Sequence, residues 1–269
     1  MQRNVVLLLA IIFLGAGLYT LVRSGSEEKR RKITSQAVSI VAGTPRERAQ
    51  SKVEEGEALE QLDRIDEAER AYTAATAVDS TFGLAFLKLG ALKLVSGYRD
   101  EARALIERAI KLDASLSDAY FHMGFIQEEE GNNVEAERAY IEAVRLDSTN
   151  AEAYNNLGHL LTRLGRPTEA IGVLEVGRRQ DPESPFLAKN LGRAYVHVGD
   201  WSQARPLLEM AVPVAARDPE VFADLATLHS ARGEVRESQD LLQRYLAAEP
   251  DSAKRAAAVE RVKNAAKKS

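Results

Sequence analysis

The sequence lacks cysteine, and it has no large excess of charge of one sign. None of its 269 residues is cysteine, which excludes disulfide bonds, thiolate metal sites and a lipid-bearing cysteine. The 36 lysine and arginine residues nearly balance the 40 aspartate and glutamate residues, and the net charge is −4. This balance argues against a general nucleic-acid-binding protein.

Motifs of catalysis and metal binding are missing too. There is no glycine-rich phosphate loop, no His-Glu-x-x-His and no Gly-x-Ser-x-Gly. His159 and His197 are expected to lie near each other, but they have no carboxylate at matching spacing. The sequence therefore predicts no enzyme, no cofactor and no metal site. We expect the acidic run from Glu128 to Glu130 to face water.

What the sequence does contain is a period of 34 residues. Six blocks without insertion run from Ala49 to Ser252. Glycine holds the eighth place of the first five blocks, as Gly56, Gly90, Gly124, Gly158 and Gly192. Alanine holds the twentieth place of the same blocks, as Ala68, Ala102, Ala136, Ala170 and Ala204. A fixed period of this length indicates a stack of like structural units.

Each block is predicted to form two helices, as the fourth block illustrates. Its first helix carries apolar residues at helical spacing from Tyr154 to Leu164, and Gly165 follows. A glycine just past a helix is favoured because it adopts positive φ without a Cβ clash. The second helix ends at Asp181-Pro182, because the residue before a proline is pushed out of the α region. Small residues at places eight and twenty let the two helices approach closely.

This pattern resembles the tetratricopeptide repeat family. Tyr154 with Leu157-Gly158, Leu191-Gly192 with Tyr195, and Ala136 with Tyr140 carry parts of its signature. The resemblance implies an all-α, right-handed superhelical solenoid of six helix-turn-helix repeats over residues 49–252. It also implies that the first helix of each pair lines a concave face.

Two blocks depart from the pattern. Block one has Lys52 and Glu55 where apolar residues are expected, so we interpret it as a capping or divergent repeat. Block five has Pro206 and Pro213 within its predicted second helix. Because a proline inside a helix removes a hydrogen bond and clashes with the preceding turn, we expect a kink or a late helix start there.

The N-terminal residues 1–24 contain a run without charge from Val5 to Val22. Eighteen helical residues span about 27 Å, close to the hydrocarbon core of a bilayer at roughly 30 Å. The run predicts one transmembrane anchor, and a cleaved signal peptide or a buried core helix are the alternatives. The basic residues after the run predict that the repeats are on the cytoplasmic side. An extracytoplasmic location, where many anchored proteins of the resembled family are found, is the alternative.

Residues 25–48 are predicted to be a linker with a short amphipathic helix from Ile33 to Val41. This helix either covers the first repeat or binds a partner. Thr44 is a candidate N-cap, with Pro45 at the first helical position. Residues 253–269 predict a basic C-terminal capping helix with a thin apolar stripe of Val259, Val262 and Ala266, whose basic residues could alternatively meet anionic lipid or nucleic acid.

The resemblance also locates a candidate groove on the first helices. Its polar, basic part in blocks four and five consists of Asn155, Asn156, His159, Arg163, Lys189, Asn190, Arg193 and His197. Amide side chains can hold a peptide backbone, and the cations attract carboxylates. We therefore expect this part to bind an acidic or C-terminal peptide; a solvated polar face is the alternative.

The same face is predicted to be apolar in blocks two and three, through Leu87, Phe121 and Phe125. An exposed apolar patch usually marks a partner site, although the Ile33–Val41 helix could cover it instead. The sequence thus predicts a membrane-tethered scaffold that binds a partner protein or peptide. The alternative is a structural assembly factor that acts through self-association or its convex face.

Overall fold

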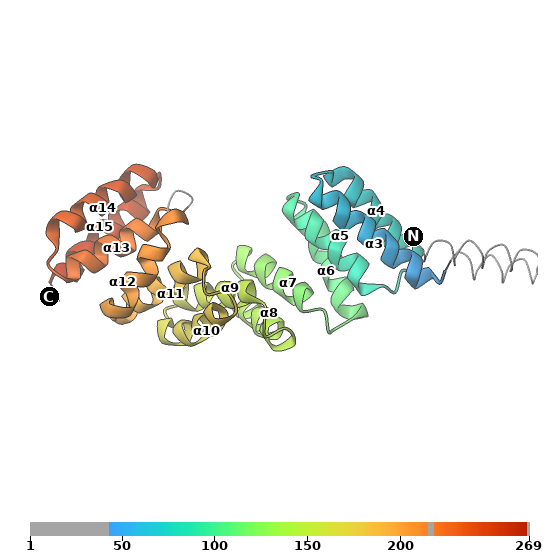
Figure 1. Ribbon diagram of the computed structural model, residues 1–269, viewed down its shortest axis with the longest axis horizontal. Helices are drawn as coiled ribbons and strands as arrows, with labels where there is room; N and C mark the ends of the chain where they lie inside the picture. The colour runs from blue at the N-terminus through green and yellow to red at the C-terminus, as the bar shows by residue number, and fades with distance from the viewer. Residues whose placement is uncertain (1–42, 215–217, 268–269) are drawn as a thin grey trace, which may run out of the picture. The chain divides into compact units, whose positions relative to one another are not determined.

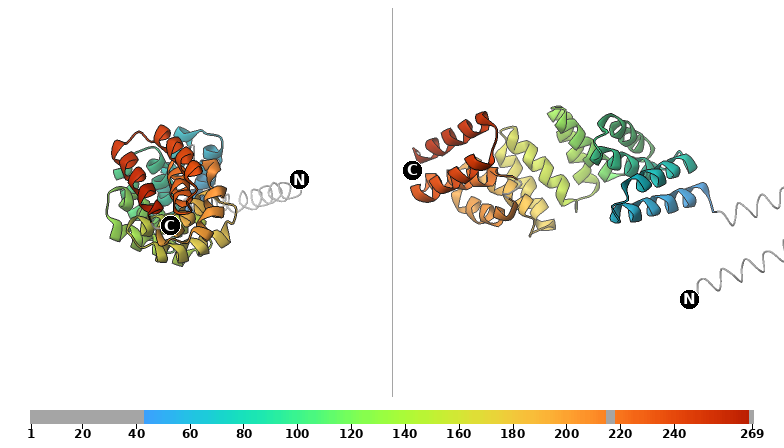
Figure 2. Two further views of the ribbon diagram at one scale, coloured as in Figure 1. Left: turned by 90° about the vertical axis from the view of Figure 1, so that its left-hand side faces the viewer. Right: turned by 90° about the horizontal axis from the view of Figure 1, so that it is seen from above.

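The computed structural model describes residues 43–214 and 218–267. These ranges contain thirteen α-helices, one 3-10 helix and no strand. They divide into two compact units at Leu112 and Asp113. Within each unit, consecutive helices lie side by side as hairpins (Figures 1 and 2).

The first unit holds two hairpins, made of α3 (Pro45–Gln61) with α4 (Ile65–Val78), and α5 (Gly83–Val95) with α6 (Arg99–Leu112). The second unit holds α7 (Ser117–Glu129), α8 (Asn133–Leu146), α9 (Ala151–Arg163), α10 (Pro167–Gln180), α11 (Pro185–Val198), α12 (Trp201–Met210), the 3-10 helix η1 (Val212–Val214), α13 (Glu220–Ala231), α14 (Val235–Ala248) and α15 (Ser252–Ala266). The six predicted helix pairs are therefore present, one in each block.

Close approach within the first five hairpins depends on the glycine of the first helix. A Cβ atom added at Gly124 would lie 2.6 Å from Cδ1 of Tyr140, and one at Gly192 would lie 2.8 Å from Cγ of Leu208. Both distances are far below van der Waals contact. The residue at place 24 of the block thus packs directly over the glycine backbone, which confirms the predicted packing role.

The turn between the two helices of each hairpin needs positive φ. Gly199 has φ 81° directly after α11, where its N–H donates to the carbonyl groups of Tyr195 and Val196. Block one has Asp63 at the equivalent place, with φ 57°. Asp63 is the only described non-glycine residue with positive φ, so the first hairpin carries backbone strain that the others avoid.

The beginning of α3 follows the prediction. Thr44 is the N-cap, and its hydroxyl accepts from the N–H of Glu47 at 3.1 Å. The Glu47 carboxylate accepts from the N–H of Thr44 at 2.7 Å, which completes a capping box, and Pro45 is the first helical residue.

Block five differs from the expectation for its second helix. This helix starts at Trp201, the same place in the block as in the other repeats, and contains Pro206. It ends early at Met210, and Pro213 lies in the 3-10 helix that follows. The predicted late start is therefore wrong, the alternative of a kink at Pro206 stays a prediction, and the helix is shortened at its C-terminal end. Pro213 has no N–H to continue the α-helical hydrogen bonds.

The C-terminal helix α15 packs mainly on α13 and less on α14. Its buried residues are Ala258, Val262 and Ala265. Elsewhere in this unit, α9 and α11 pack more on the second helix of the preceding hairpin than on the first. Helix α13 itself packs on α11, α12, α14 and α15, and every one of its residues from Ala223 to Ser230 is buried.

No helix among the described residues is long and apolar enough to cross a membrane. The predicted anchor at residues 5–22 and the predicted amphipathic helix from Ile33 to Val41 lie outside the described ranges.

Candidate partner-binding site

The amide residues predicted for the groove meet where α9 packs on α11. Asn190 donates from Nδ2 to Oδ1 of Asn155 at 2.8 Å, and Asn155 donates to Oδ1 of Asn156 at 3.3 Å. Asn190 is only 4% exposed, and its Oδ1 has no hydrogen-bond partner among the described residues. The three amides thus form a connected row with one unused buried acceptor.

The two cations predicted to attract a partner are already paired. Nζ of Lys189 lies 2.6 Å from Oδ2 of Asp218, and Nε of Arg193 lies 2.7 Å from Oδ2 of the fully buried Asp224. Burial would raise the pKa of Asp218, but the hydrogen bond and charge of Lys189, the charge of Arg193 and the N–H of Glu220 together hold this pKa below its ordinary value. Because both side chains are held in ion pairs inside the second unit, Lys189 and Arg193 are not free to attract a partner.

Glu128 corrects a further expectation. Its side chain is 11% exposed rather than facing water, and it accepts from the hydroxyl of Tyr140 at 2.9 Å. It also pairs with Arg163 at 3.2 Å, and Nδ1 of His159 lies 3.6 Å away. Burial would raise the pKa of Glu128, but the neighbouring His159, the hydroxyl of Tyr140 and the charge of Arg163 together lower it overall. Glu128 is therefore a mostly buried anion of α7 that contacts both α8 and α9.

Two hollows lie on either side of the amide row. One has a volume of about 290 Å³ and is lined by His159, Thr162, Arg163, Arg193, His197, Glu220 and Arg261. The other has a volume of about 320 Å³ and is lined by Phe121, Ala151, Glu152, Asn155, Asn156, Asp181, Ser184, Phe186 and Leu187. Six of the eight polar residues predicted for the groove therefore line one of these hollows.

Arg261 of α15 is a residue of this site that the sequence reading did not include. Its guanidinium lies 3.3 Å from Glu220 and 3.3 Å from Asp224 on α13. The basic composition of residues 253–269 was visible in the sequence. Nothing in the sequence showed that this helix would turn back onto α13 and bring Arg261 beside His197.

The two histidines line the same hollow, as expected. Among the described residues, no group of three or more histidine, cysteine, aspartate or glutamate side chains could hold a metal ion. The hollow presents the imidazole groups of the two histidines and the guanidinium groups of its arginines to a ligand.

The predicted apolar patch is only partly present. Leu87 is buried at 3% exposure, so it does not contribute to an exposed surface. Phe121 is half-buried and packs near the ring of Tyr140, with centroids 6.2 Å apart. Phe125 is 38% exposed. Phe186, which the sequence reading did not select, is 45% exposed and lines the 320 Å³ hollow.

Comparisons with known proteins support the repeat architecture. A model of the tetratricopeptide repeat protein 21 C-terminal ARM domain matches residues 26–191, and a tetratricopeptide repeat model matches residues 187–220. No curated protein sequence matches the chain.

Several solved structures share the fold. PilF of Pseudomonas aeruginosa has 15% identity and a TM-score of 0.67, with 79% of this chain and 97% of that chain covered. YrrB, described as a TPR protein with an unusual peptide-binding site, has 17% identity and a TM-score of 0.58, with 71% and 98% covered. PilW, described as a type IV pilus biogenesis factor, has 21% identity and a TM-score of 0.56, with 70% and 87% covered. At these identities the likeness concerns the fold alone.

Proposed function

Because this chain belongs to the tetratricopeptide repeat family, we propose that it is a protein-interaction scaffold that holds an extended segment of a partner against α9 and α11. The observation that carries this proposal is the hydrogen-bonded row of Asn155, Asn156 and Asn190, which has a hollow on either side. The amide groups of Asn155 and Asn156, which line the 320 Å³ hollow, can donate to and accept from the backbone of such a segment. YrrB, which has the same fold, is described as having a peptide-binding site.

The two hollows suit side chains on either side of that segment. The 320 Å³ hollow offers the rings of Phe121 and Phe186 to an apolar side chain. The 290 Å³ hollow offers His159, Arg163 and His197 to a polar one. Lys189 and Arg193 would support the site through their ion pairs rather than by contacting the partner.

We also propose that residues 5–22 tether the repeats to a membrane. The support is the length and hydropathy of this run in the sequence, together with the basic residues that follow it. The anchor would fix the location of the scaffold, and the repeats would select its partner.

A photo-crosslinking amino acid at position 186 tests the interaction site in cells. We expect a discrete adduct that disappears when Asn155→Leu is added, because leucine removes both hydrogen-bonding groups from the row. The control places the same crosslinker at Val235, which is 59% exposed on α14 and lines neither hollow.

Equal adducts at positions 186 and 235, or an adduct indifferent to Asn155→Leu, would refute the site. An adduct with a second copy of this chain, together with dimers in light scattering, would favour the alternative of self-association.

A further inference from the structure

The cleft between α10 and α12 lies on a different face of α11 from the amide row. Its floor consists of Leu191 and Leu207, which are both buried, and its volume is about 600 Å³. At about 100° per residue, Leu191 and Tyr195 project from the face of α11 opposite to Lys189 and Arg193. The cleft is therefore separate from the site proposed above.

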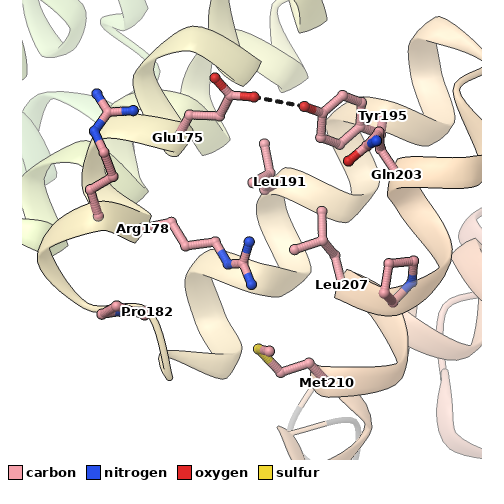
Figure 3. A pocket seen from close by; sticks show the side chains of 10 residues that line it. Glu175, Arg178, Pro182, Leu191, Tyr195, Gln203, Leu207 and Met210 are labelled. Carbon is pink, nitrogen blue, oxygen red and sulfur yellow. Dashed lines mark hydrogen bonds between the residues drawn. The ribbon is translucent and has the colours of Figure 1, made fainter.

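Two arginines of α10 provide the positive charge of this cleft. Figure 3 shows the guanidinium of Arg178 extending over the floor toward Leu207 and Met210. Its Nε is buried and has no hydrogen-bond partner among the described residues. Arg179 lines the same cleft and is exposed. The one carboxylate in the lining, Glu175, accepts from the hydroxyl of Tyr195 at 2.7 Å at the far end.

Comparison with the other blocks shows that the charge is specific to this cleft. Place 28 of the block holds Arg178 here, but Thr76, Ile110, Val144, Val212 and Leu246 elsewhere. Place 19 holds Gln203 here, but Glu67, Glu101, Glu135, Glu169 and Glu237 elsewhere. One substitution adds a cation and the other removes an anion, and both residues line the cleft. Neither the arginine at place 28 nor the glutamine at place 19 is needed for packing, because the other blocks pack with different residues there.

The lining also limits what kind of ligand fits. The volume lies within the range of ligand sites and is too large for a single small ion. The rim residues Arg179, Pro182 and Gln203 are exposed, so the cleft is open enough for a chain to pass across it. The floor and Met210 offer apolar surface directly beside the guanidinium of Arg178.

From this geometry we infer that the α10–α12 cleft binds a peptide segment of a partner in which an acidic side chain neighbours an apolar one. The carboxylate pairs with Arg178 and Arg179, since guanidinium groups favour carboxylates in charge-assisted, often bidentate, hydrogen bonds. The apolar neighbour covers Leu191, Leu207 and Met210. Gln203 donates a hydrogen bond where a glutamate would repel the ligand.

A peptide library displayed against the whole 269-residue chain in detergent micelles tests this inference. The probe is a library of random octapeptides with blocked ends. We expect the selected peptides to share an aspartate or glutamate next to leucine, isoleucine or phenylalanine. Their affinity for the chain is expected to fall at least tenfold for Arg178→Val and for Gln203→Glu, and to weaken with added salt.

These two variants restore the residue types of the other blocks, so they are expected to keep the fold, which a melting curve checks. Arg236→Val, which removes an exposed arginine of α14, is the control for net charge and should change affinity less than twofold. Selection without acidic peptides, or selected peptides that bind Arg178→Val as well as the original chain, would overturn the inference. Loss of binding with Asn155→Leu but not with Arg178→Val would assign the peptides to the α9–α11 site instead.

Discussion

Tyr140 donates its hydroxyl hydrogen bond to Glu128, twelve residues earlier, across the hairpin of α7 and α8. Tyr72 and Glu60 make the same contact at the same places of block one. The other four blocks have an aliphatic residue at the tyrosine place and no acidic residue at the glutamate place. The tyrosine and glutamate therefore occur as a pair, because either one alone would leave a polar group unsatisfied at a buried position.

Tyr140→Phe tests this pairing. The variant keeps the ring but removes the hydrogen bond to a charged group, which contributes about 1.5–3 kcal/mol. We expect the free energy of unfolding, measured with urea, to fall by that amount. Tyr98→Phe, at a tyrosine that is 54% exposed, is the control and should change it by less than about 0.5 kcal/mol. Equal effects of the two variants would contradict the pairing.

Gly158→Leu tests the close approach of α9 and α10. Its new side chain would collide with Leu174, so we expect overpacking to lower the free energy of unfolding by about 1–3 kcal/mol. Gly172→Ala on α10 is the matched control, because a Cβ there meets no atom within 4 Å. Alanine should stabilise that helix by up to about 1 kcal/mol. Thermal melting that shows no difference between the two variants would refute the packing argument.

Arg193→Met tests whether the cation at the amide row is structural. Asp224 is fully buried, and the variant leaves it with only the more distant ion pair to Arg261, at 3.3 Å instead of 2.7 Å. We expect a loss of about 3 kcal/mol in the free energy of unfolding, at the low end for a broken buried ion pair. Arg236→Met, on the exposed side of α14, should cost less than about 0.5 kcal/mol. A stable Arg193→Met variant that fails to bind its partner would show instead that Arg193 contacts the partner.

Asp218→Asn tests the pH dependence of the pair with Lys189. The pKa of Asp218 is lower in the folded chain than its ordinary value of 3.8, so folding favours its charged form. Its stabilisation is therefore fully present above pH 3.8 and is lost as the pH falls through the lower, folded-state pKa. The variant should be less stable than the original chain at pH 7, and the difference should shrink below pH 3.8. A difference that stays constant in urea titrations down to pH 2.5 would exclude this linkage.

The absence of cysteine makes the proposed membrane topology directly measurable. Ala248→Cys places one thiol at an exposed position of α14 in a chain that has no other. If the repeats are cytoplasmic, an impermeant maleimide should label this thiol only after the membrane is opened. Labelling of intact cells would place the repeats outside. Release of the chain from membranes by alkaline carbonate would contradict the anchor itself.

The period of 34 residues was sufficient to predict the hairpins, because helix spacing, closing glycines and the place-eight glycine all depend on nearby sequence. The ion pairs Lys189–Asp218 and Arg193–Asp224 were not predictable in this way. Lys189–Asp218 joins the first helix of block five to the residue that precedes block six, and Arg193–Asp224 joins blocks five and six. Helical spacing does not show which charges meet across a packed interface. For the same reason, Glu128 was expected in water, although the hydroxyl of Tyr140 draws it inward.

The position of α15 also limits how this stack can be lengthened. Because α15 lies over α13, it covers surface that the first helix of a seventh hairpin would need for its own packing. A protein engineer who fused another repeat after Ser252 would first have to remove α15 and supply new partners for Ser230 and Asp224. Insertion of whole 34-residue modules between existing hairpins avoids this obstacle, so the array is easier to enlarge internally than at its C-terminal end.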